Sequence, residues 1–357
     1  MNNASISSSS SSYDYSCSGK LALVTGATGR VGSLVTKMLL EKGFCVRIFS
    51  RSNEKVEVKF GHVLQNQDNN EQVIEVAIGN LGDGTTVSKA FLPRDTSNGV
   101  SVSHVVYAAG GEEADFDAVN NRGVAECAFE AAKAGSKKMI VISAAWVSKP
   151  YSLASLLFNA LYPNYPMARH FQGEQAVREA VAHSDSNLSY VILRAGRLVP
   201  DSEYPATGPK GLLYEQGDAF SFFGPAGQPG MCNTQLADAV VTALDATSGK
   251  YTLEVTSGPV DTHDTSVYDN FSQDVLVAVS SDDVEKCHAE GIRDLKIGLL
   301  FLVTSLLVTS SLCSRVFQRV FVVLVGLAVF VISWSLFLSD ISVVGCSRHS
   351  LVSLKEL

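Results

Sequence analysis

Three evenly spaced glycines, Gly26, Gly29 and Gly32, have the clearest chemical meaning in this sequence. They lie in the stretch LALVTGATGRVG, directly after a short apolar run from Leu21 to Val24, and a helical pattern of apolar residues follows them. Strand, glycine turn and helix in this order are the context of a dinucleotide-binding turn. The first glycine allows the tight turn, the second lets the backbone approach a pyrophosphate, and the third lets the helix pack close to the strand. The alternative is a glycine-rich turn that binds no ligand.

Two arginines near this turn indicate which nicotinamide cofactor it would bind. The apolar segment 44–49 predicts a second strand, which ends in Ser50-Arg51-Ser52. An acidic residue at this strand end holds the ribose 2′-hydroxyl, whereas an arginine accommodates a 2′-phosphate. Arg51 stands there and Arg30 lies in the glycine turn, so the sequence favours NADP over NAD. Alternatively, Arg51 is only a solvated charge at a strand end.

The rest of the first 258 residues alternates short apolar runs with helical stretches. Strands are predicted at 73–78, 102–108, 139–143, 190–193 and 251–256, and helices at 85–91, 117–134, 171–182 and 236–244. This alternation predicts an α/β fold with a doubly wound, Rossmann-like parallel sheet. Small residues, Ala108 to Gly110, follow the fourth strand and leave room for a nicotinamide ribose. Residues 199–232 contain five prolines and are expected to form a long loop, such as a substrate lid.

Composition argues against several classes of function. The chain has 357 residues and a net charge of -8, with no basic block in the folded part, so no nucleic-acid partner is expected. Its seven cysteines form neither C-x-x-C nor a zinc spacing, which predicts no metal site and free thiols in a reducing compartment. Residues 1–18 are a serine-rich tail without the apolar run of a signal peptide, and they are expected to be disordered.

Several segments resemble the atypical short-chain dehydrogenase/reductase superfamily, in its NAD(P)-binding, NmrA-like branch. TGATGRVG resembles its nucleotide loop, GNLGD at 79–83 its GDL motif, and AAKAGSKKMIVISA at 131–144 its fourth-helix-to-fifth-strand signature. YVILRAGRL at 190–198 and LADAVVTAL at 236–244 resemble two later segments, so the resemblance covers residues 19–258. It implies that Asn80 lies near the adenine, where the family usually has aspartate. The predicted cofactor site comprises Gly26, Thr28, Gly29, Arg30, Val31, Gly32, Arg51, Asn80, Leu81, Ala108, Ala109 and Gly110.

The resemblance also implies where catalytic residues would lie. In active members a tyrosine handles the substrate proton, a lysine four residues later lowers the pKa of that tyrosine, and a serine polarises the substrate oxygen. Here Ser143 ends the fifth strand, and the nearest match to the other pair is Tyr165 with Arg169. Arginine keeps its charge and could lower the pKa of a tyrosine. Pro163 and Pro166, however, disturb the helix that normally aligns the two side chains.

A second alignment leaves the catalytic prediction open. Counting back from Glu174, the family's helix glutamate, puts the lysine position on His170 and the tyrosine position on Pro166. Two functions therefore remain: an NADPH-dependent reductase of a small or lipophilic carbonyl substrate, and a non-catalytic NADP-binding assembly or regulatory factor acting on a partner protein. A third possibility is a membrane-shaping protein whose nucleotide domain no longer binds its ligand.

Two apolar segments near the C-terminal end, 297–313 and 320–338, contain no charged residue. Each has a length in the range of roughly 17–25 residues that spans a bilayer. We predict a two-helix membrane hairpin at 295–339, which contacts the membrane through 297–338, after a linker at 259–294 and before a tail at 340–357. The basic flanks favour a globular domain in the cytosol or an equivalent compartment. The alternatives are a shallow hairpin and a pair of buried core helices.

Overall fold

The structure is a computed structural model of the chain. It describes residues 20–65, 74–93, 100–112, 114–145, 147, 159, 162, 165–184, 187–205, 211–215, 230–245 and 249–258. The predicted tail at 1–18, the linker at 259–294, the hairpin at 295–339 and the C-terminal tail lie outside these residues. Of the helices in the described part, none combines the length and the apolar character needed to cross a bilayer.

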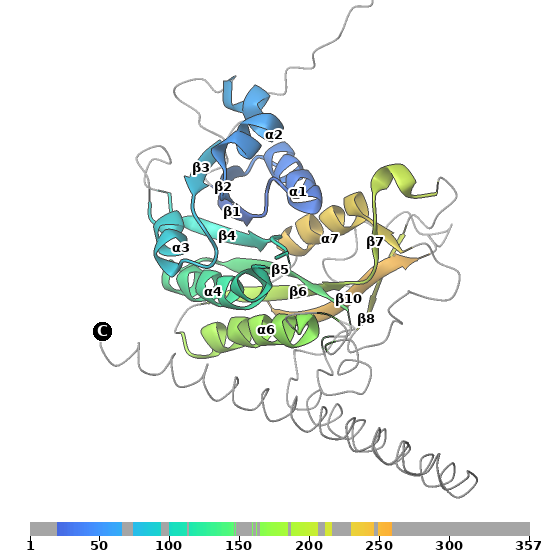
Figure 1. Cartoon of the computed structure of the whole chain (residues 1–357). Coiled ribbons are helices and arrows are strands. Elements are labelled where there is room, and N and C mark those ends of the chain that lie inside the picture. Colours follow the sequence, from blue (N-terminus) through green and yellow to red (C-terminus); the bar gives the residue numbers. More distant parts are fainter. Residues whose placement is uncertain are drawn as a thin grey trace, which may run out of the picture.

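An eight-stranded sheet forms the centre of the molecule, in the order β3-β2-β1-β4-β5-β6-β10-β8 (Figure 1). Its strands are β1 (Leu21–Thr25), β2 (Cys45–Ser50), β3 (Ile74–Ile78), β4 (Val102–Tyr107), β5 (Lys138–Ala144), β6 (Ser189–Ala195), β8 (Gly211–Glu215) and β10 (Lys250–Gly258). Neighbouring strands are parallel except for the antiparallel pair of β10 and β8. Strand order reverses between β1 and β4, and ligands bind outside the carboxyl ends of such strands at this position.

Helices cover both faces of the sheet (Figure 1). One group consists of α1 (Arg30–Glu41), α2 (Asn53–Gln65) and α7 (Asn233–Asp245), and the other of α3 (Gly84–Phe91), α4 (Val124–Lys133) and α6 (Pro166–Ala182). Alternation along β1 serves both layers, since Ala22 and Val24 join one apolar cluster and Leu21 and Leu23 the other. The predicted α/β architecture is therefore confirmed as a mostly parallel, Rossmann-like sheet with flanking helices.

Two regions of the structure differ from the predicted helices and loops, and one cysteine differs from the predicted free thiols. The region 199–232 is not one continuous loop, since it contains η3 (Asp201–Glu203) and β8, and β7 (Leu198–Val199) pairs with β9 (Met231–Cys232) at its ends. Helix α2 was not predicted, because its apolar face is narrow and Val58 is 79% exposed. Cys127 and Cys232 are free as expected, but Cys45 is disulfide-bonded, so the expectation of free thiols is wrong at that residue.

The predicted helix at 117–134 begins with a π-helix, η2 (Ala118–Gly123), before it continues as α4. Close packing by α6 accompanies this irregular turn. A Cβ atom on Gly173 of α6 would lie 2.3 Å from the carbonyl oxygen of Asn120 in η2. The buried Tyr107 hydroxyl donates a hydrogen bond to the carbonyl oxygen of Val119 in the same turn. Short π-helical turns of this kind are common beside functional sites.

Candidate functional site

The glycine turn between β1 and α1 is compact in a way that only glycine permits. Gly26 has a φ of +67°, and a Cβ atom there would lie 2.6 Å from the carbonyl oxygen of Ala108, beyond the end of β4. A Cβ atom on Gly32 would lie 2.2 Å from the carbonyl oxygen of Gly26. At Gly29 the corresponding distance to the same oxygen is 3.1 Å. The roles predicted for these glycines in the turn and in helix packing thus correspond to close approaches in the structure.

Helix α1 begins at this turn with amides that precede the first hydrogen bond within the helix. Its N-cap, Gly29, has no side chain to accept a hydrogen bond, and the first intrahelical bond runs from the Ser33 amide to the Gly29 carbonyl oxygen, 3.1 Å away. The amides of Arg30, Val31 and Gly32 precede that bond. Such amides, with the positive end of the helix dipole, bind phosphate. Arg30, Val31 and Gly32 would therefore act through their backbone amides, because none of the three lines the cavity described next.

A cavity of about 220 Å³ opens beside the turn, at the carboxyl ends of the strands. Nine of the twelve residues predicted for the cofactor site line it: Gly26, Thr28, Gly29, Arg51, Asn80, Leu81, Ala108, Ala109 and Gly110. The structure adds Phe49, Ser50, Ser52, Lys55, Gly79 and Val119. The sequence argument stopped at the strand end and therefore missed Ser52 and Lys55, which are respectively just before and inside α2.

The β2–α2 turn holds the basic residues of the cavity. The amide of Ser52 donates to the Ser50 hydroxyl over 3.2 Å, and the amide of Lys55 donates to the Ser52 hydroxyl over 3.3 Å. Ser52 thereby caps the first turn of α2. Arg51 lies between these serines with a side chain that is 62% exposed, and its Nη1 lies 2.6 Å from Oδ2 of Asp115. Two cations, from Arg51 and Lys55, therefore line the same end of the cavity.

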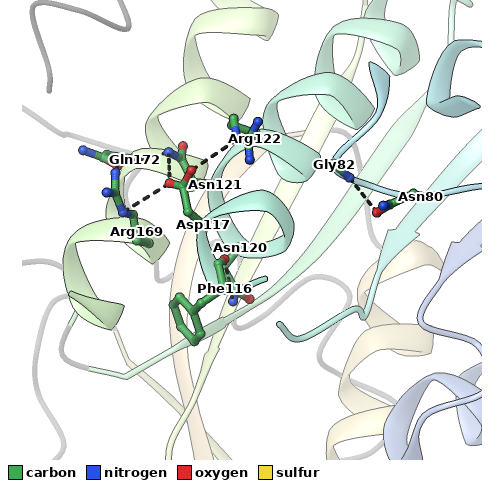
Figure 2. A network of polar contacts seen from close by, with 9 residues as sticks. All are labelled: Asn80, Gly82, Phe116, Asp117, Asn120, Asn121, Arg122, Arg169 and Gln172. Atoms are coloured by element: carbon green, nitrogen blue, oxygen red, sulfur yellow. Dashed lines mark hydrogen bonds and ion pairs between the residues drawn. The ribbon is translucent and has the colours of Figure 1, made fainter. Parts of the chain in front are cut away.

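The loop after β3 forms the neighbouring wall. The side-chain Oδ1 atom of Asn80 accepts a hydrogen bond from the backbone amide of Gly82 over 3.0 Å, as Figure 2 shows. The backbone amide of Asn80 donates to the Thr86 hydroxyl over 3.0 Å. Asp83 caps α3, and its hydrogen bonds from Thr85 lower the pKa of the Asp83 carboxyl. Asn80 is thus held by its own loop and lines the cavity, where the resemblance placed the adenine contact.

Ser143 is part of a buried ionic cluster away from the cavity. Its hydroxyl donates to Oε1 of Glu174 over 2.7 Å, and Arg194 binds the same carboxylate through two hydrogen bonds of 2.9 and 2.6 Å. Arg178 adds a contact of 3.2 Å to Oε2. Burial alone would raise the pKa of Glu174, but Arg194 and Arg178 outweigh it and lower the pKa from 4.5 to about 2. The Ser143 hydroxyl thus contacts α6, and its place beside a nicotinamide stays a prediction.

Tyr165 and Arg169, the other predicted catalytic residues, lie at the start of α6. Tyr165 immediately precedes α6 in a left-handed conformation, with φ of 51°, and is 44% exposed. Arg169 lies 3.2 Å from Oδ1 of Asp117 and donates to Oε1 of Gln172 over 2.9 Å, in the network of Figure 2. The side chains of Ser143 and Arg169 thus bind different partners: Glu174 for Ser143, and Asp117 and Gln172 for Arg169.

His170, the other candidate for the lysine position, is a packed residue. Its ring meets the ring of Phe116 edge to face, with centroids 5.4 Å apart. Burial lowers the pKa of His170 to about 4, an effect that nearby Glu174 opposes and Arg194 reinforces. The imidazole is therefore neutral at neutral pH and cannot replace the lysine cation.

Comparison with known proteins agrees with this geometry. The NAD(P)H-binding family matches residues 26–247, which is most of the described chain. GDP-mannose 4,6 dehydratase 1 from Arabidopsis thaliana is 33% identical over 91 residues, which make up 24% of this chain and only 25% of that protein.

Two solved structures resemble the chain at low sequence identity, and the first of them shares its fold. The oxidoreductase ylbE from Lactococcus lactis gives a TM-score of 0.51 at 17% identity, over 74% of this chain and 100% of that chain. A short-chain dehydrogenase/reductase from Veillonella parvula, solved in complex with NADP, gives a TM-score of 0.44 at 16% identity, over 68% and 96% of the two chains. With the glycine turn, the cavity and the family match together, the chain belongs to the NAD(P)H-binding family.

Proposed function

We propose that this chain is an NADP(H)-binding protein that acts through nucleotide occupancy, as an assembly or regulatory factor, and is held at a membrane by residues 297–338. The observation that carries the nucleotide part is the cavity itself. In the glycine turn beside the cavity, close backbone contacts leave no space for side chains at Gly26 and Gly32. The cations of Arg51 and Lys55 line the cavity itself.

The residues present fit a dinucleotide. The amides at the start of α1 would bind the pyrophosphate, Asn80 would face the adenine, and Arg51, Ser52 and Lys55 would bind the 2′-phosphate. When bound, the nicotinamide supplies a two-electron hydride donor or acceptor. The chain's own groups favour binding over Tyr-Ser catalysis, because the Ser143 proton is donated to Glu174 and Arg169 is paired with Asp117.

Replacing Arg51 with alanine is expected to weaken NADPH binding about 10- to 100-fold, while NADH binding changes less than about threefold. A hydrogen bond to a charged group contributes about 1.5–3 kcal/mol, and only NADPH carries the 2′-phosphate. Isothermal titration calorimetry of the full chain in detergent measures both affinities. Arg122→Ala is the matched control, since Arg122 is 61% exposed and pairs with Asp117 but does not line the cavity. Equal loss of NADPH and NADH affinity in Arg51→Ala would refute the assignment of the 2′-phosphate site.

The membrane part of the proposal rests on the two uncharged apolar segments, 297–313 and 320–338. Insertion of a helix of that length buries enough apolar surface to be effectively irreversible. The full chain is therefore expected to float with liposomes and to resist extraction by alkaline carbonate. Release of the intact chain by carbonate would contradict an inserted hairpin and leave a peripheral association.

One observation favours a reductase as the second candidate. Among the residues that the structure describes, no atom would lie within 4 Å of a Cβ atom on Gly110, and this space beyond the end of β4 is where a substrate would lie beside the nicotinamide. Turnover is the discriminating test. Oxidation of NADPH by carbonyl compounds that Tyr165→Phe abolishes, with NADPH affinity unchanged, would replace the regulatory proposal by the reductase.

A further inference from the structure

The ion pair between Arg51 and Asp115 joins two loops that are not neighbours. Arg51 follows β2 and Asp115 lies in the segment after β4, while β1 runs between these two strands in the sheet. The pair therefore crosses the carboxyl end of β1, where the glycine turn begins. This contact connects the segments after β2 and β4 across the edge of the sheet where the glycine turn lies.

The carboxylate of Asp115 is held in place by its own turn. Its Oδ1 atom accepts a hydrogen bond from the Glu112 amide over 2.7 Å, and the Asp115 amide donates to the Glu112 carbonyl oxygen over 3.1 Å. Oδ2 is then directed to Nη1 of Arg51 at 2.6 Å. Asp115 is 27% exposed, whereas Arg51 is 62% exposed. The arginine is the more exposed partner, and the carboxylate is the one held by its own turn.

We propose that Asp115 is an internal competitor for the 2′-phosphate of NADP(H), and so a residue that sets the preference between the two nicotinamide cofactors. This inference rests on the proposed NADP(H) site. A carboxylate and a phosphate are both anions that bind a guanidinium. The 2′-phosphate must take hydrogen bonds of Arg51 from Asp115, or bind close to that negative charge. NADH has no such group and leaves the pair intact.

The exchange has a consequence for the loop as well as for affinity. Asp115 joins the segment after β4 to the β2–α2 turn, and two residues later Asp117 contacts Arg122 and Arg169 at the start of η2 (Figure 2). Where the 2′-phosphate takes the hydrogen bonds of Arg51 from Asp115, NADP(H) would detach this loop from Arg51, whereas NAD(H) would leave the pair intact. The protein would thus distinguish the phosphorylated cofactor by the position of a loop that leads directly into the π-helix and its contacts with α6.

Asp115→Asn tests the competition, because it removes the charge and nearly preserves the shape. We expect NADPH affinity to rise about three- to tenfold while NADH affinity stays within about twofold, a difference in line with the strength of exposed charge interactions. Calorimetry of the full chain in detergent measures both. Glu112→Gln is the matched control, since it removes the same charge from the same loop, and Glu112 contributes only its backbone to the Asp115 turn.

A double-mutant cycle separates competition from general electrostatics. If Asp115 acts through Arg51, the gain from Asp115→Asn disappears in the Arg51→Ala background. An unchanged or lowered preference for NADPH in Asp115→Asn would overturn the inference, as would an equal gain in Glu112→Gln. Wild-type protein that binds neither nucleotide would overturn the proposed function itself. Wild-type protein that binds NADPH, with no effect of Asp115→Asn, would overturn only the role of Asp115.

Discussion

Gly32→Ala is expected to lower the affinity for NADPH and NADH alike by at least about 100-fold. The new methyl group would lie 2.2 Å from the carbonyl oxygen of Gly26 and 3.1 Å from the Cα atom of Ala27. Both are backbone atoms, which cannot rotate away as a flexible side chain could. The turn or the start of α1 must move, and the amides that would bind the pyrophosphate move with it. Forcing an extra methyl into a packed site also costs about 1–3 kcal/mol of folding stability. Calorimetry and chemical denaturation measure the two effects.

Gly61→Ala provides the control for this prediction. Gly61 lies inside α2, and a Cβ atom there would meet nothing within 4 Å. Alanine at this position should leave both affinities unchanged and raise the free energy of unfolding by about 0.5–1 kcal/mol, because glycine is unfavourable in a helix interior. Retention of normal NADPH affinity by folded Gly32→Ala would show that the turn between β1 and α1 is not the pyrophosphate site.

The second large effect concerns stability, at the carboxylate of Glu174. Glu174 is 1% exposed, and Glu174→Gln removes the carboxylate that the buried side chains of Arg194 and Arg178 bind. Breaking a buried ion pair by removing one partner costs about 3–5 kcal/mol. We therefore expect the free energy of unfolding to fall by that amount in Glu174→Gln, measured by urea denaturation at neutral pH. The contact between α6 and the ends of β5 and β6 would be the first to loosen.

The same carboxylate predicts how stability depends on pH. Its pKa is about 2 in the folded chain and near 4.5 when unfolded, so the unfolded state binds more protons between these values. Each tenfold change in proton affinity corresponds to about 1.4 kcal/mol, so the ionised Glu174 carboxylate stabilises the folded chain by about 3 kcal/mol. This stabilisation is fully present above pH 4.5 and is lost as the pH falls toward 2. Glu174→Gln should lack this component of the acid sensitivity. A parallel decline of wild type and Glu174→Gln over this range would contradict the assignment.

Ser143→Ala gives a graded comparison for the same cluster. It removes one hydrogen bond from the carboxylate and leaves both arginines in place, so a loss of about 1 kcal/mol is expected. If Glu174→Gln does not fold, the smaller loss in Ser143→Ala still tests the cluster, because an exposed or unpaired serine would give no change.

The sequence was sufficient for the features that depend on neighbouring residues. The apolar run before Gly26, the three glycines and the helical pattern after them together define a local unit, and the structure confirms it as β1, the turn and α1. Arg51 was found for the same reason, because it directly follows a recognisable strand. Features of this kind are encoded within about ten residues, where periodicity and glycine spacing are informative.

Contacts between distant residues were not predictable in this way. Ser143 and Glu174 are 31 residues apart, and Arg51 and Asp115 are 64 apart, so only the folded chain shows that these side chains pair. Ser143 illustrates the difficulty, since its place at a strand end was correct while its hydroxyl faces α6. The π-helix η2 and the antiparallel strand β8 also depend on tertiary packing, through Gly173 against Asn120 and through pairing with β10.

Titration of the full chain with NADPH and NADH, in detergent and at low salt, tests the central claim most directly. The account predicts one NADPH site per chain, bound more tightly than NADH, with the preference lost in Arg51→Ala. Absence of binding to either nucleotide by a protein with a cooperative unfolding transition would contradict it, and the fold would then have a structural role alone.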